Sequence, residues 1–282
     1  AEVVWIWEQG ARDESAPHII GLSRGMLEEG EQDSVILGDD IQLAEGTIYT
    51  VLFQGKDMAG NPGPFLSIND VVYDTTHPEI SWHLPDSSGF ANSSVVSFVS
   101  SEDFMEAQIR WEHVGGIPDD GAPYIVELEG TELDGGEHLY EALANSPHLV
   151  DGAIYSITMN GKDLAGNEAA SIEVSNIVYD TSPPTLATIA PEPGISVRGG
   201  EVIYNLSEDF ASAEIDWVLE EAEASDSRSV SIKISDEGLA LGDHRLDDST
   251  FVERLTDGGI FTIQLTGRDK AGNEALPSSI SN

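Results

Sequence analysis

The sequence predicts an all-β protein, a tandem array of β-sandwiches that follow one another as an extended rod. A seven-residue motif recurs every 106 residues, at 55–61, 161–167 and 267–273. Between its copies, short stretches alternate apolar and polar residues, which is the pattern of half-buried strands. No stretch keeps a helical period, although the Glu- and Ala-rich residues 217–225 are compatible with a short turn of helix.

The repeat divides the chain into three units. Tryptophan recurs at the same interval, as Trp5, Trp111 and Trp217, so several anchors share one register. The boundaries give a first unit over 1–74, which lacks strands A and B of the repeat, a complete second unit over 75–180 and a nearly complete third unit over 181–282. We expect the first unit either to continue an array that begins before Ala1 or to receive its missing strands from a neighbouring chain.

Seven strands are expected in the second unit. They fall at 79–84, 95–99, 107–112, 124–128, 138–143 and around 155–159, with a last strand that ends at Tyr179. The sixth is the clearest, because Tyr155, Ile157 and Met159 point to one face. Seven short strands in roughly 100 residues, separated by turn signals, indicate an immunoglobulin-like β-sandwich with Trp111 in its core.

The recurring motif is predicted to form the hairpin turn between the last two strands, F and G. Its glycine permits a positive φ, and its aspartate and asparagine side chains can bond the local backbone. Asp163 and Asp269 are therefore expected to cap their own turns.

Short motifs also mark the loops and boundaries of the units. They are Gly-Lys-Asp-Leu-Ala-Gly-Asn at 161–167, Tyr-Asp-Thr-Ser-Pro-Pro at 179–184 and Ser-Glu-Asp-Phe at 101–104 and 207–210. Together they resemble the bacterial immunoglobulin-like tandem repeats of large surface adhesins and other giant extracellular proteins, over the whole chain. The resemblance implies extracellular or cell-surface repeats that act as extenders, many of which bind calcium between units.

The composition excludes several classes of partner. Lys and Arg number 12 and Asp and Glu number 52, which gives a formal net charge of −40. Such a field repels nucleic acid and anionic membrane surfaces and favours cations or a saline habitat. The chain has no cysteine, so disulfides and thiolate metal sites are excluded. No apolar run approaches the length of about 18 residues that inserts into a membrane.

Candidate calcium ligands follow from the expected topology. The B–C and F–G loops lie at one end of such a sandwich and strand G finishes at the other, so each linker aspartate meets the loops of the next unit. Calcium takes six to eight oxygen ligands, which clustered carboxylates can supply. Alternatively, the turn aspartates only cap their turns while the others face water; the two roles are compatible. The candidates are Asp74, Glu102, Asp103, Asp163 and Asn167 at the first junction, and Asp180, Glu208, Asp209, Asp269 and Asn273 at the second.

Two classes of function remain open. The first is a structural extender, stalk or filament segment, whose partners are neighbouring repeats and other copies of the chain. The second is a carbohydrate- or protein-binding adhesive module. Nearly equal loop lengths in the three units favour the extender, because a binding module usually carries one enlarged, divergent loop. No enzyme is expected: the sequence has no nucleophile elbow, phosphate-binding loop or His-Glu-x-x-His motif, and we expect no metal role for its histidines.

Overall fold

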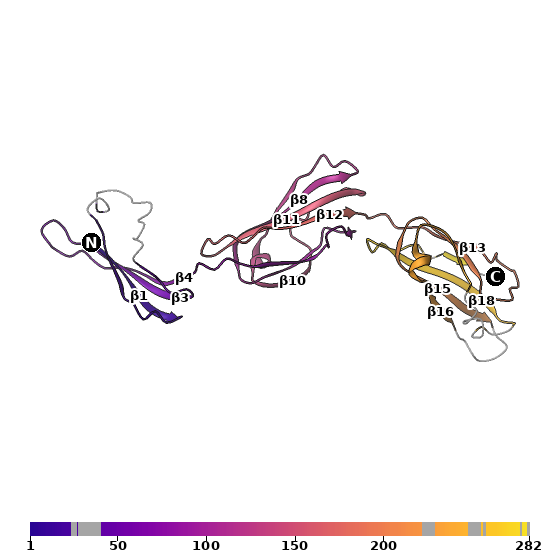
Figure 1. Cartoon of the computed structure of the whole chain (residues 1–282), viewed down its shortest axis with the longest axis horizontal. Helices are drawn as coiled ribbons and strands as arrows, with labels where there is room; N and C mark the ends of the chain where they lie inside the picture. Colours follow the sequence, from indigo (N-terminus) through magenta and orange to yellow (C-terminus); the bar gives the residue numbers. More distant parts are fainter. Residues whose placement is uncertain are drawn as a thin grey trace.

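The predicted all-β fold is confirmed. The computed structural model describes residues 1–23, 27, 41–221, 229–247, 255, 258–276 and 278–280. Their strands form five sheets, each contained within one of the three repeat units. Figure 1 shows the units following one another along the long axis of the molecule. No helix in these ranges is long and apolar enough to cross a membrane.

The first unit contributes one four-stranded antiparallel sheet in the order β2-β1-β3-β4. No second sheet covers it within the described residues of 1–74. The consequence is visible in β4, where Ile68 is 64% exposed, whereas Val174, one repeat later, is 5% exposed. The strands are β1 (Glu2–Gly10), β2 (His18–Gly21), β3 (Thr47–Gln54) and β4 (Leu66–Tyr73).

The second unit is a complete sandwich of two sheets. The smaller sheet has the order β10-β7-β5 and the larger one β6-β12-β11-β8-β9. All seven expected strands are present, and β6 is an additional two-residue strand that pairs in parallel with β12. The strands are β5 (Ile80–Leu84), β6 (Phe90–Ala91), β7 (Val96–Ser100), β8 (Phe104–Gly116), β9 (Tyr124–Glu127), β10 (Gly136–Glu141), β11 (Ala153–Asp163) and β12 (Ile172–Tyr179), with a 3-10 turn η2 (Gly130–Leu133) before β10.

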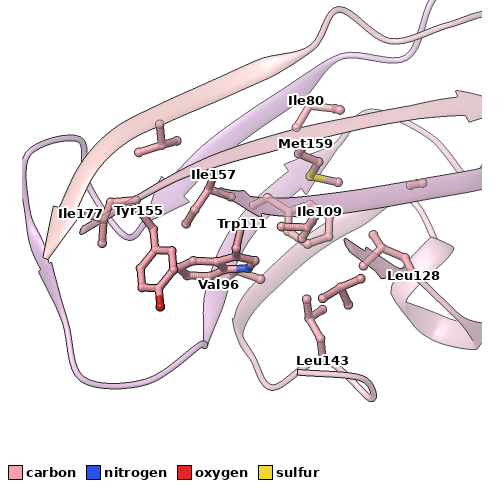
Figure 2. Close-up of a cluster of buried hydrophobic side chains, with 14 of the residues drawn as sticks. Ile80, Val96, Ile109, Trp111, Leu128, Leu143, Tyr155, Ile157, Met159 and Ile177 are labelled. Carbon is pink, nitrogen blue, oxygen red and sulfur yellow. The ribbon is translucent and has the colours of Figure 1, made fainter. Parts of the chain in front are cut away.

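The core of the second unit lies between these sheets, as Figure 2 shows. Trp111 on β8 is fully buried, as predicted, and packs edge-on against Tyr155 of β11 at a centroid distance of 6.1 Å. Phe98 of β7 is also fully buried and comes from the opposite sheet. Each buried side chain of this size contributes about 1.5–3 kcal/mol, so the alternation seen in the sequence accounts for the sandwich.

The third unit repeats this architecture with the sheets β13-β14-β17 and β16-β15-β18-β19. Trp217 is 3% exposed in its core. The expected helical turn over 217–225 is wrong up to Glu221, because those residues belong to β15; residues 222–225 lie outside the described ranges. The elements are β13 (Leu186–Ala190), β14 (Val202–Leu206), β15 (Phe210–Glu221), β16 (Val230–Lys233), η3 (Asp236–Leu239), β17 (Gly242–Leu246), β18 (Ile260–Asp269) and β19 (Ser278–Ile280).

Two histidines share a repeat position that the sequence analysis left without a role. His138 stacks on Phe98 at 4.5 Å, and His244 stacks on Tyr204 at 5.4 Å. In each case the ring nitrogen Nε2 bonds the carbonyl oxygen of the residue four positions earlier, at 2.8 Å and 2.5 Å respectively. These histidines therefore hold the start of β10 and of β17 against the core of their units.

A buried aspartate is paired with the strand-F tyrosine in the first two units. Tyr155 donates to Asp119 at 2.5 Å, and Tyr49 donates to Asp13 at 2.6 Å. Desolvation raises the pKa of Asp119, but hydrogen bonds, first from Tyr155, outweigh it and leave that pKa below its usual value. The third unit carries Phe261 in place of the tyrosine and Ser225 in place of the aspartate, so donor and acceptor are replaced together.

Replacing Tyr155 with Phe should lower the free energy of unfolding of the second unit by about 1–3 kcal/mol, because a buried carboxylate loses a partner. Adding Asp119→Ser, which reproduces the third unit, should recover part of the loss. The lowered pKa of Asp119 means that its contribution is present above the usual pKa of an aspartate and disappears as pH falls through the folded-state value. Denaturant titrations at neutral and acidic pH would measure the free energy of unfolding of each variant. An equal loss of stability at both pH values would contradict the role of the ionised Asp119 carboxylate.

Candidate metal centres at the junctions between units

The direction of the last strand brings each linker to the loops of the next unit. In the second unit β12 runs antiparallel to β11, with Val178 opposite Ile154, so it ends far from the F–G turn. At the other end of β11, Asp163 pairs with Phe104, which places the B–C loop (101–103, between β7 and β8) beside that turn. The expected meeting of linker and loops follows from these two registers.

Three carboxylates of each expected set come together. At the first junction Asp74, Glu102 and Asp163 each offer an oxygen, and these oxygens lie within 4.8 Å of one another. The second junction has the same arrangement in Asp180, Glu208 and Asp269. One member of each group, on the F–G turn, is buried and the other two are half-buried. One carboxylate comes from the linker and two from the following unit, so a cation held by all three would join both sides.

The F–G turn is capped by its own aspartate, as predicted. Asp163 Oδ1 accepts from the backbone N–H groups of Ala165 and Asn167 at 2.8 and 2.9 Å, and Gly166 has a φ of 94°. Asp269 caps the third unit's turn in the same way, accepting from the N–H of Asn273 at 2.9 Å. The cap fixes the direction of the aspartate side chain, which leaves its carboxylate facing the linker.

The turn asparagine connects two units. Asn167 Nδ2 donates to Asp163 Oδ2 at 2.8 Å and to the carbonyl oxygen of Asp74 at 3.1 Å. Asn273 Nδ2 makes the equivalent bonds, both at 2.8 Å, to Asp269 and to the carbonyl of Asp180. Both side chains therefore bind the linker through their amide nitrogen, and metal ligation by their oxygens stays a prediction.

Asp103 and Asp209 are not part of the three-carboxylate groups. Asp103 Oδ1 accepts from the N–H of Gly135 at 2.7 Å, and Asp209 Oδ1 from the N–H of Leu241 at 3.0 Å. Asp209 also forms an ion pair with Lys270, with Oδ2 and Nζ 2.8 Å apart. The two aspartates therefore connect the B–C loop to the loop before β10 or β17. This role was not predicted from the sequence.

Each linker is also bound by an acidic residue of the preceding unit, which was not predicted from the sequence. Asp151 accepts from the N–H of Thr181 at 2.5 Å and from the Ser182 hydroxyl at 2.8 Å. Glu45, one repeat earlier, accepts from the N–H of Thr75 at 3.0 Å. The signal that could have found them is their shared repeat position, 106 residues apart, in the loop before strand F.

The grouped carboxylates repel one another. Desolvation is the main cause that raises the pKa of Glu102, followed by the charges of Asp74 and Asp163. The pKa of Glu208 is raised for the equivalent reasons, and burial also raises that of Asp180. Like charges gathered in partly desolvated surroundings favour a bound proton or a cation.

Comparison with known proteins identifies no family: no family model matches the chain, and neither does any curated protein. Among solved structures, the crystal structure of the FN1–FN3 domains of chicken CNTN1 is similar over 86% of this chain and 76% of that chain, at 11% sequence identity. The TM-score is 0.41, too low to indicate a shared fold. The β-sandwich fold is established by the sheets and cores of the chain itself.

Removing one grouped charge should stabilise the cation-free protein. In chelator at neutral pH, Glu208→Gln should raise the melting temperature of the third unit by roughly 1–4 °C, because it relieves repulsion of the half-buried Glu208 carboxylate by Asp180 and Asp269. The raised pKa of Glu208 gives the same sign: stability should increase as pH falls toward that value. Glu220→Gln, at an exposed position on β15, is the control. A lower melting temperature for Glu208→Gln alone would contradict the repulsion.

Proposed function

We propose that the chain is a structural extender, a stalk or filament segment of a secreted or cell-surface protein, whose junctions are stiffened by calcium. The observation that carries the proposal is the repetition of one junction design. At both junctions an asparagine of the next unit binds the linker carbonyl, and an acidic residue of the preceding unit binds the linker from the other side. An extender needs this reuse, because each joint must transmit the same geometry to the next unit. The role requires no catalytic activity.

Calcium is the cation we propose for the grouped carboxylates. It accepts six to eight oxygen ligands in flexible geometry, so three carboxylates, backbone carbonyls and water would complete a shell. Asp74 or Asp180 would supply the linker's share, and the turn aspartate with Glu102 or Glu208 the next unit's share. A cation held in this way would neutralise the repulsion and limit rotation at the joint.

The proposed extracellular location follows from the same chemistry. Half-exposed sites with few preorganised ligands suit the weak affinity of extracellular calcium modules, about 10⁻⁴ to 10⁻³ M. The net charge of −40 keeps such a chain soluble and apart from anionic surfaces. Neighbouring repeats, and other copies in a filament, are the partners we propose.

No observation in the described residues favours the alternative of an adhesive binding module. Exposed aromatic side chains clustered on one sheet face would favour it. Instead Trp7 donates its indole N–H to the carbonyl of Ala11 at 2.9 Å, and Trp82 stacks on Phe98 at 6.4 Å. The other exposed aromatic side chains are dispersed over the first two units: Phe65, Phe90 and Tyr140.

Calcium should raise the melting temperature of the chain, because a ligand that binds only the folded state stabilises it by RT ln(1 + [L]/Kd), about 2.7 kcal/mol at a concentration of 100 Kd. Calorimetry with calcium and with chelator measures the shift, and small-angle X-ray scattering should show a longer, stiffer particle with calcium. Identical melting and scattering curves would refute the cation's role.

Asp180→Ala should weaken only the second junction, since the first group of carboxylates is unchanged. The calcium-dependent part of the stabilisation should fall, while the part due to the first junction persists. Asp120→Ala is the matched control, because it removes the same charge from an exposed position outside both groups. If Asp120→Ala reduced the calcium-dependent stabilisation equally, the change in net charge alone would explain the effect.

A further inference from the structure

The tip of the F–G turn is one of several repeat positions at which the two junctions differ. The second unit carries Leu164 there and the third unit carries Lys270. The ammonium nitrogen of Lys270 lies 5.9 Å from the ring centroid of Phe90, which belongs to β6 of the preceding unit. Asp209, in the same unit as the lysine, holds that nitrogen at 2.8 Å. The positively charged Lys270 side chain therefore contacts residues on both sides of the second junction.

The backbone shows the same close approach. A Cβ placed on Gly272, in the third unit's F–G turn, would lie 3.6 Å from Asn92 Nδ2, just after β6. The turn of the third unit thus packs against the 90–92 segment of the second, and Lys270 is part of a surface contact rather than an isolated pair.

At the first junction Leu164 takes the place of Lys270, and the positions equivalent to 90–92 are not in this sequence. Leu164 is 71% exposed, and no ion pair connects the described parts of 1–74 with the second unit. A cleft of about 520 Å³ lies there instead, lined by Val72, Asp74, Glu102, Asp103, Leu164 and Ala165.

We propose that Lys270 is a built-in cationic tether, which holds the second junction in one arrangement without an added cation. A cation over an aromatic face is attracted by the ring quadrupole, and the carboxylate of Asp209 keeps the ammonium in place. The side chains are partly exposed, so screening by salt weakens the tether. The inference rests on the proposed extender function, but the tether requires no metal.

The test uses equivalent label pairs at the two junctions. The chain has no cysteine, so cysteines introduced at exposed positions of the last strands are the only labelling sites. Ser67 and Glu173 report the first junction, and Glu173 and Ser279, one repeat later, report the second. Spin-label distance distributions are measured on the full chain in chelator at low salt. The distribution across the second junction is compared between the unmodified chain and its variants.

Lys270→Met should broaden the distance distribution across the second junction. The population of molecules in which the two units have moved out of contact should rise about threefold to tenfold, as expected for the loss of a cation–π contact with a supporting ion pair. Phe90→Leu should do the same, and the double variant should add little, because both remove one interaction. About 1 M salt should reproduce the Lys270→Met result, since the Debye length falls to about 3 Å. Circular dichroism checks that each variant stays folded.

Lys162→Met is the control, because it removes a lysine that pairs within the second unit, with Glu106 and Glu168, and the second distribution should stay unchanged. The proposal is overturned if Lys270→Met leaves the second distribution unchanged, if the two single variants add independently, or if Lys162→Met broadens the second distribution as strongly. Calcium is then added separately. If calcium narrows neither distance distribution, calcium has no role in the proposed function. The tether proposal is unaffected by that result, because the tether is measured in chelator.

Discussion

The antiparallel pairing of the last two strands determines where the chain leaves each unit. In the second unit β12 returns along β11, so Tyr179 lies at the end opposite the F–G turn. The linker must then meet the loop end of the next unit, because the register of β15 with β18 places that unit's B–C loop beside its own turn. The carboxylate groups, the asparagine bridges and the lysine contact all depend on this direction of the chain.

Much of this could be predicted from sequence, for a physical reason. Burial alternates with period two along β11, and the 106-residue step superposes each strand on its copy, so strands and core residues such as Trp111 were correctly identified. The topology of a sandwich was sufficient to predict that Asp74 would meet Glu102 and Asp163, because strand direction alone brings them to one place. The cation itself is not tested by the geometry and stays a proposal.

The remainder depends on how loops approach one another, which no local pattern encodes. Asp103 and Asp209 were expected among the metal ligands, yet a backbone N–H from the loop before strand E accounts for one oxygen of each. The helical turn expected after Trp217 reflected Glu and Ala propensity, and pairing of β15 with β18 overrode it. The linker-binding residues Glu45 and Asp151 were detectable only as a shared repeat position.

The short strand β6 has a mechanical consequence. It belongs to the segment by which the chain enters the second unit, and it pairs in parallel with β12, the strand by which the chain leaves. The backbone hydrogen bonds that connect the two segments include those from Ser88 to Ser175 at 2.8 Å, from Val178 to Gly89 at 3.0 Å and from Asp180 to Ala91 at 2.9 Å. Tension applied at the two ends of the unit acts along these parallel segments in opposite senses. The bonds are therefore loaded together in shear rather than opened one at a time, which is the stronger way to resist a pull.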